Sequence, residues 1–182
     1  MKIVKYVLLI MLVTSLSACS LNNEESPLNE FNESITEVVS NTTGLIENAS
    51  QVLTYVQTTQ GTFQEILNIS SQWTNTFNAL SNGEITNEQL VSVVTNEMLP
   101  LNESLMTQIE GFIPPTDATA MINDVLLNAV TTQNEALENV VKGIQSGNYS
   151  VVNSANEMIS NVQGFEGQFT KMIQDIITQY GF

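Results

Sequence analysis

The sequence predicts an all-α fold, an antiparallel bundle of four or five long amphipathic helices with heptad-like packing. Apolar residues recur in alternating steps of three and four along most of the chain, which is the spacing of helices packed with coiled-coil geometry. Short turns that contain glycine and end on threonine or serine separate the long periodic stretches. No stretch of the sequence is typical of a strand.

The first helix is predicted over about residues 28–80, within a bundle that spans residues 28–182. Its apolar seam is Leu28, Phe31, Ile35, Val38, Thr42, Leu45, Ala49, Val52, Val56, Thr59, Phe63, Ile66, Ser70, Trp73, Phe77 and Leu80. A second apolar row, which includes Val39, Ile46, Leu53 and Leu67, widens the stripe and favours a bundle over a two-stranded coil. Polar seam residues and a glycine coincide near residues 58–61, so both an unbroken helix and a break there remain open.

The second helix is predicted over residues 87–112, after the turn SNGEIT. Gly83 suits the left-handed position that ends a helix, and Thr86 with Gln89 three residues on forms a capping box. Pro100 predicts a kink or a restart within this helix. The apolar positions expected to face the core are Leu90, Val94, Leu101, Leu105 and Ile109.

Two further helices are predicted over residues 117–145 and 150–180. Gly147 is expected to stop the third helix, and Ser150 to cap the fourth. The fourth helix is expected to present Val151, Ala155, Met158, Val162, Phe165, Phe169, Met172, Ile176 and Tyr180 to the core. The turns at Gly83 and Gly147 share one order of residue types, which either indicates two related hairpins or reflects common turn chemistry.

The first eighteen residues have the layout of a secretory signal. Lys2 and Lys5 supply positive charge, an apolar core of about ten residues follows, and the small residues Ser17 and Ala18 end the segment. That apolar run is shorter than the roughly 20 residues needed to span a bilayer. An uncleaved membrane anchor is the alternative.

The residues Leu16, Ser17, Ala18 and Cys19 resemble the lipobox of bacterial lipoproteins. The resemblance implies that signal peptidase II cuts between Ala18 and Cys19 and that the Cys19 thiol carries a diacylglyceryl group. Two acyl chains are enough for stable anchoring. The chain is then expected to be held on the extracytoplasmic side of a bacterial membrane, with residues 19–27 as a tether.

The composition is strongly acidic, with nineteen acidic residues, four lysines and a formal net charge of −15. Two of the lysines lie in the signal, which leaves Lys142 and Lys171 in the mature chain. Such a surface repels nucleic acid, so no nucleic-acid partner is expected.

The sequence offers little for catalysis. Histidine is absent, and the single cysteine is assigned to lipidation, so triads and the usual zinc sites are not expected. Asp117 and Asp124 lie seven apart without the oxygen ligands of a calcium loop. We therefore expect no enzyme activity, no catalytic residue, no cofactor and no metal.

Two apolar groups are open to a structural and a functional interpretation. Trp73 and Phe77 lie on the seam and are expected in the core, although they could anchor a partner. The methionines could line an adaptable ligand pocket, but core packing is the preferred interpretation for Met98, Met106, Met121, Met158 and Met172.

The helical body loosely resembles small helical-bundle lipoproteins of unknown function from Gram-positive bacteria. That resemblance implies a non-catalytic module that binds a protein or a component of the cell envelope. One specific version is an exclusion-type lipoprotein, which blocks the entry of related phages or conjugative elements. The alternative is a carrier that holds a lipid or another apolar ligand between its helices.

Overall fold

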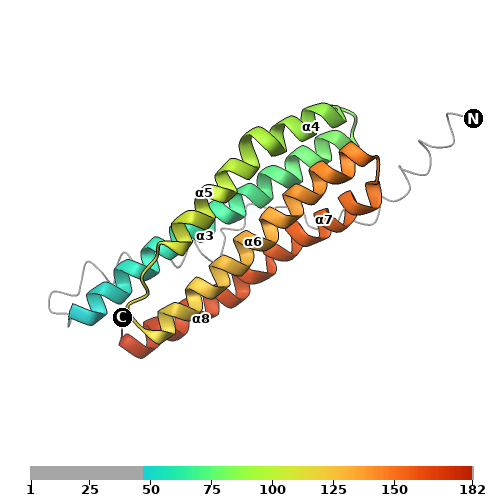
Figure 1. Cartoon of the computed structure of the whole chain (residues 1–182). Coiled ribbons are helices and arrows are strands. Elements are labelled where there is room, and N and C mark those ends of the chain that lie inside the picture. The colour runs from blue at the N-terminus through green and yellow to red at the C-terminus, as the bar shows by residue number, and fades with distance from the viewer. Residues whose placement is uncertain (1–46, 182) are drawn as a thin grey trace, which may run out of the picture.

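The computed structural model describes residues 47–181, and within them every regular element is helical (Figure 1). The signal, the tether, Cys19 and the part of the first predicted helix before residue 47 lie outside the described residues. In chain order the elements are α3 (Glu47–Ser81), α4 (Asn87–Val93), the π-helical segment η2 (Val94–Met98), α5 (Leu99–Glu110), α6 (Asp117–Ser146), α7 (Tyr149–Val162) and α8 (Gly164–Tyr180).

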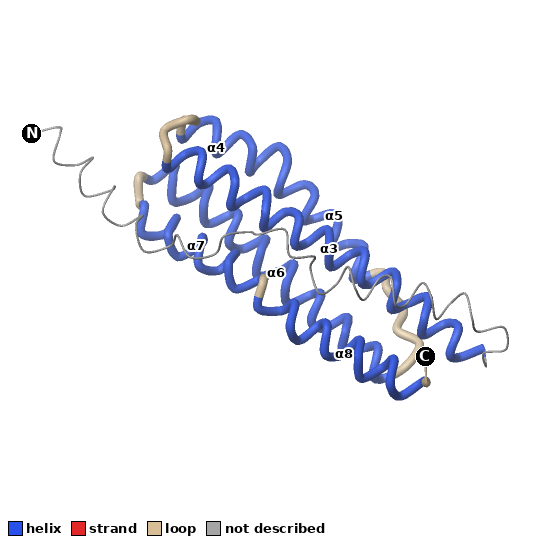
Figure 2. The backbone as a smooth tube through the Cα atoms, turned by 180° about the vertical axis from the view of Figure 1, so that it is seen from behind, coloured by secondary structure: helices blue, strands red, loops and turns tan. Residues whose placement is uncertain are grey.

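The helices form four arms that run up, down, up and down. α3 and α6 run in one direction, and the α4–η2–α5 arm and the α7–α8 arm return beside them (Figure 1). α6 contacts each of the other three arms. Figure 2 shows the two short turns at one end of the bundle and the longer α5–α6 connection at the other end, near the C-terminus. The predicted antiparallel helical bundle is confirmed.

α3 is continuous for 35 residues, so the break considered near residues 58–61 is absent. The threonine hydroxyls of this stretch bond back to carbonyls of the preceding turn: Thr58 Oγ1 donates to Thr54 O at 2.9 Å and Thr59 Oγ1 donates to Tyr55 O at 2.9 Å. Thr59 is completely buried, and this bond satisfies its hydroxyl inside the core. Gly61 is exposed and leaves the helix unbroken.

Gly61→Ala is expected to stabilise the protein by about 0.5–1 kcal/mol, because glycine in a helix interior costs that much relative to alanine. A Cβ at residue 61 would meet no atom within 4 Å. Urea unfolding measures the change. Gly83→Ala is the matched control, since Gly83 has φ of +75° and alanine is strained there, so that variant should lose stability. A less stable Gly61→Ala protein would contradict the packing described for α3.

The two short turns share one hydrogen-bonding plan. After α3, the N–H of Glu84 donates to Ala79 O at 2.9 Å and that of Gly83 donates to Leu80 O at 3.0 Å. After α6, the N–H of Asn148 donates to Gly143 O and that of Gly147 donates to Ile144 O. Both pairs of bonds are those of the Schellman motif, and both central glycines have positive φ, which confirms the left-handed position predicted for Gly83 and the helix stop predicted at Gly147.

The N-terminus of α4 has the predicted capping box. The Gln89 backbone N–H donates to Thr86 Oγ1, and the Thr86 backbone N–H donates to Gln89 Oε1. The predicted disturbance at Pro100 takes the form of the π-helical turn η2 directly before it, where Leu99 N–H donates to Val94 O. Proline has no backbone N–H to donate to the carbonyl four residues back, and its ring crowds that carbonyl. The wider π turn relieves the crowding.

The π-helical turn changes which residues of this arm face the core. Leu101, predicted as a core position, is 53% exposed, and Asn102 is completely buried in its place. A π turn holds one residue more than an α turn, which changes the helical repeat just before Pro100; after Met98 the buried row continues at Asn102 in place of Leu101 and then returns to the predicted positions. The prediction for Leu101 was wrong for this reason, while Leu105 and Ile109 are buried as expected.

The fourth predicted helix is divided in two, and its first residue differs from the prediction. Asn148, and not Ser150, occupies the N-cap of α7, without a side-chain capping bond. α7 ends at Val162 and α8 begins at Gly164, with Gln163 between them (Figure 2). Two glycines at residues 164 and 167 weaken helix propensity here. Val162 and Phe169 are nevertheless buried on the inner face, as predicted.

Candidate functional site

The site residues predicted at the N-terminus, Ala18 and Cys19, lie outside the described residues. Their assignment to cleavage and lipidation therefore stays a prediction. The other candidate groups named from the sequence all lie on the described helices.

The two aspartates considered as metal ligands lie on the surface of the described helices. Asp117 and Asp124 are both exposed on α6. Within residues 47–181 no group of three or more Asp, Glu, His or Cys side chains is placed to hold a metal ion.

Trp73 belongs to the core, as preferred from the sequence. Its side chain is 1% exposed, its Nε1 donates to Asn156 Oδ1 at 2.9 Å, and its ring stacks on Phe77 at a centroid distance of 5.2 Å. A side chain enclosed in this way links α3 to α7 and cannot serve as an exposed partner anchor.

The methionines are distributed between the core and the surface. Met98 is completely buried, and Met106, Met158 and Met172 are partly buried against the core, so these four follow the packing interpretation. Met121 is 59% exposed, and its expected core position was wrong. It lies in the second turn of α6 and points away from the face of the helix on which Thr119 and Ile122 are buried.

Buried amide side chains crosslink the arms and were not identified from the sequence. Gln133 Nε2 donates to Ile66 O at 3.0 Å and to Ser70 Oγ at 2.7 Å, which joins α6 to α3. Asn102 Nδ2 donates to Val130 O at 2.9 Å, which joins α5 to α6. Since a buried amide loses these bonds when helices slide, the pairs favour one axial register of the arms. We interpret them as structural.

Tyr55 is the described group with the most perturbed ionisation. Its ring is buried in α3 and meets Phe112 edge-on, and its hydroxyl donates to Asn123 Oδ1 at 3.2 Å. Burial, with a smaller contribution from the nearby Asp124 carboxylate, raises the pKa of Tyr55 to about 12. The phenol is therefore neutral at physiological pH and acts as a hydrogen-bond donor between α3 and α6.

The raised pKa of Tyr55 predicts a loss of stability in alkali. The folded protein holds this proton more tightly than the unfolded chain, whose tyrosines titrate near 10. The stabilising contribution is therefore complete below about pH 10 and is lost as the pH rises toward 12. Urea unfolding between pH 9 and about pH 11.5 should show a smaller fall in stability for Tyr55→Phe than for the wild type. Parallel pH profiles for the two proteins would contradict this assignment.

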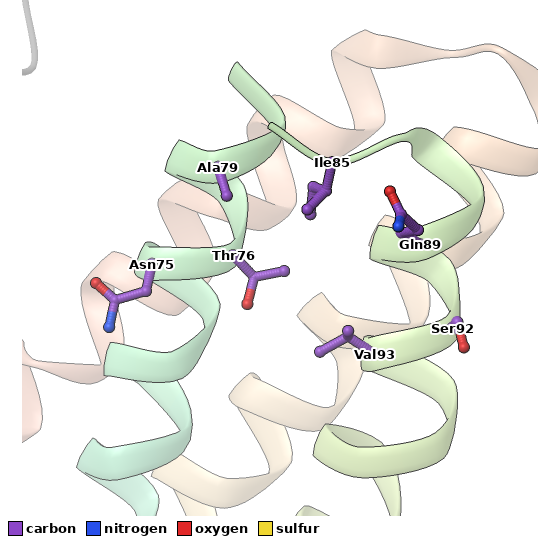
Figure 3. Close-up of a pocket in the computed structure, with 7 residues that line it drawn as sticks. All are labelled: Asn75, Thr76, Ala79, Ile85, Gln89, Ser92 and Val93. Carbon is purple, nitrogen blue, oxygen red and sulfur yellow. The ribbon is translucent and has the colours of Figure 1, made fainter. Parts of the chain in front are cut away.

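An open apolar groove lies at the corner between the end of α3 and the start of α4, and we call it the α3–α4 groove (Figure 3). It measures about 480 Å³ and is open to solvent along one side. The residues that line it are Asn75, Thr76, Ala79, Ile85, Gln89, Ser92 and Val93. No pattern in the sequence indicated this groove, because its walls come from two separate helices and the turn between them.

The groove lies at the end of the bundle that carries both short turns. There Asn87 Nδ2 donates to the Tyr149 hydroxyl at 2.9 Å, so the start of α4 is tied to the start of α7. The two turns that share one sequence plan are thus brought together, and the wall of the groove is held against the second hairpin.

Comparisons with protein-family models, with curated protein sequences and with solved structures gave no significant match. Within residues 47–181, none of the helices has both the length and the apolar character required to cross a bilayer.

Proposed function

We propose that this protein is a membrane-anchored extracytoplasmic lipoprotein that acts as a non-catalytic interaction module for a protein or an envelope component. The observation that carries the proposal is the order Leu16, Ser17, Ala18 and Cys19 behind a short, positively charged apolar segment. An exclusion-type role, in which the partner arrives with an incoming phage or conjugative element, is one version of this function.

The described helices support an interaction role over chemistry. Their large apolar side chains fill the core between the arms, and the exposed faces carry mainly amide, hydroxyl and carboxylate groups. Some of the buried polar groups make structural bonds between helices, as at Trp73 and Gln133. What the described surface offers to another molecule is therefore its charge and its few accessible apolar side chains.

The anchor is tested by Cys19→Ser, since serine has no thiol to receive a diacylglyceryl group. The wild-type protein is expected to partition into the detergent phase of a Triton X-114 extract and to begin at residue 19 with the mass of an acylated cysteine. The variant is expected to keep its signal uncleaved and to incorporate no labelled palmitate. Ser17→Ala, which keeps a small residue before the cleavage point, is the matched control. Palmitate labelling of the Cys19→Ser protein would contradict the assignment.

The interaction role is tested by native mass spectrometry of the lipidated protein, extracted from its own host in a mild detergent. We expect a mass increment that matches a second protein in defined stoichiometry, after crosslinking in intact cells has preserved the complex. A stoichiometric lipid beyond the acyl groups on Cys19, with no protein partner, would overturn the interaction role in favour of a carrier.

A further inference from the structure

We propose that the α3–α4 groove is a docking site for a protein segment that presents an apolar side chain flanked by lysine or arginine residues. This inference rests on the proposed interaction function and names the surface that performs it. It follows from the shape of the groove, from the side chains that line it and from the charges around it.

The floor of the groove is mainly apolar, and two of its polar residues are engaged by local hydrogen bonds. Figure 3 shows Ile85, Val93 and Thr76 pointing toward one another across the space between α3 and α4. Thr76 Oγ1 donates to Gln72 O at 2.8 Å, which leaves its methyl group toward the groove. Gln89 Oε1 is held by the capping bond from Thr86 N–H. An occupant therefore meets methyl and methylene groups at the centre.

The openness of the groove selects the kind of occupant. Sites for small molecules enclose most of the ligand surface, whereas this groove is walled by two helices and open on its outer side. A side chain from a segment that lies across the surface fits such a groove, with its flanking residues left outside at the rim. The rim therefore decides which segments are accepted.

Three acidic residues lie next to the lining residues along the chain, Glu84, Glu88 and Glu97, and we call their side chains the rim carboxylates. Glu84 lies beside Ile85 and accepts a bond from Asn82 Nδ2 at 3.3 Å. Glu97 lies one turn after Val93 and accepts a bond from Gln72 Nε2 at 3.2 Å, which bridges the two walls.

Glu88 is exposed and lies one turn before Ser92 on α4. Hydrogen bonds from the Thr86 side chain and from its own backbone lower the pKa of Glu88 and so favour its ionised form.

No cation of the described chain neutralises the rim carboxylates. Both lysines within residues 47–181 are engaged in their own helices, Lys142 with Glu138 and Lys171 with Asp175, each at 2.9 Å. The groove is therefore an apolar surface surrounded by the negative electrostatic potential of the rim carboxylates. Such a potential attracts basic segments and repels acidic ones.

The test uses the lipidated protein in a neutral detergent and a fluorescein-labelled heptapeptide of five lysines and two leucines, one of which is photoreactive. Fluorescence anisotropy measures binding, and mass spectrometry locates the crosslink. We expect saturable binding and crosslinks within residues 72–97. The same peptide with both leucines replaced by serine, or with glutamates in place of the lysines, should bind at least about tenfold more weakly.

Two triple variants distinguish the effect of the rim carboxylates on peptide binding from the effect of the overall negative charge. The rim variant, Glu84→Gln with Glu88→Gln and Glu97→Gln, should bind the peptide about fivefold to tenfold more weakly, since exposed ion pairs are individually weak. The control variant removes the same charge from exposed positions away from the groove and should bind as the wild type does; it changes Glu103, Glu110 and Glu135 to glutamine. Equal weakening in both variants would overturn the proposal.

Ala79→Leu tests the floor independently of charge. Ala79 points into the groove from α3, and leucine is a good helix former, so the variant should fold and obstruct the groove. We expect binding of the lysine–leucine peptide to fall at least about tenfold, with circular dichroism unchanged. Crosslinks outside residues 72–97, or full binding to a folded Ala79→Leu protein, would reject the groove. A partner found by native mass spectrometry that still binds the Ala79→Leu protein would leave the interaction function intact and reject this surface alone.

Discussion

Val162→Asp is expected to lower the free energy of unfolding by about 3–5 kcal/mol, because it places an unpaired charge inside the packed core. Val162 is completely buried in the last turn of α7 and belongs to the central apolar cluster. Within the described chain both lysines pair with carboxylates on exposed helix surfaces, so none is free to compensate a buried aspartate. A loss of this size is a large fraction of the stability of a domain.

The measurement is thermal and urea unfolding followed by circular dichroism. Asn161→Asp is the matched control: it adds the same charge one residue earlier, at an exposed position of the same helix, and should change stability by no more than about 0.5 kcal/mol. If the two variants melt at the same temperature, the inner face of α7 has been assigned incorrectly.

The positions that face the core were predictable where helices are regular. In α3 the seam residues Val56, Phe63 and Trp73 are all buried, because a spacing of three and four residues returns side chains to one face of an α-helix. Capping at Thr86 and the positive φ of Gly147 were predictable for a similar reason, since both depend only on neighbouring residues.

The exchange of Leu101 for Asn102 could not be predicted from periodicity. Periodicity assumes one helical repeat throughout, whereas the π turn η2 changes that repeat just before Pro100. Proline indicated the place of the disturbance but not its form, because a kink, a restart and a π turn are all compatible with a missing N–H. The break after Val162 was not predicted, and the local sequence feature that accompanies it is two glycines in an otherwise periodic stretch.

The α3–α4 groove could not be predicted from the sequence, for a different reason. Its lining residues come from two helices and the turn between them, and each has another local explanation: Gln89 caps a helix and Thr76 bonds to its own backbone. Local sequence patterns specify helices and their ends, whereas the space left between two diverging helices depends on side-chain volumes across the contact. A surface of this kind becomes visible only when the arms are assembled.

Gly143→Ala is expected to destabilise the protein even though alanine is the better helix former. A Cβ at residue 143 would lie 2.8 Å from Val152 Cγ2, 3.1 Å from Asn148 O and 3.2 Å from Val152 N. Two of these atoms belong to the backbone at the start of α7, and the Val152 side chain is buried and β-branched, so neither can move aside freely. Overpacking of this kind costs about 1–3 kcal/mol, which exceeds the gain in helix propensity of about 1 kcal/mol.

The comparison of Gly143→Ala with Gly61→Ala isolates this contact, because both variants make the same chemical change in the interior of a helix. Urea unfolding should give opposite signs, with Gly143→Ala less stable than the wild type and Gly61→Ala more stable. Gly143→Val should be worse than Gly143→Ala, since its branched side chain meets the same backbone atoms. Equal gains in stability from the two alanine variants would mean that α6 and α7 approach each other less closely at Gly143 than the structure shows. The opposite signs would establish that glycine at this position permits the close packing of the second hairpin, whose first turn also holds α4 through Tyr149 and Asn87.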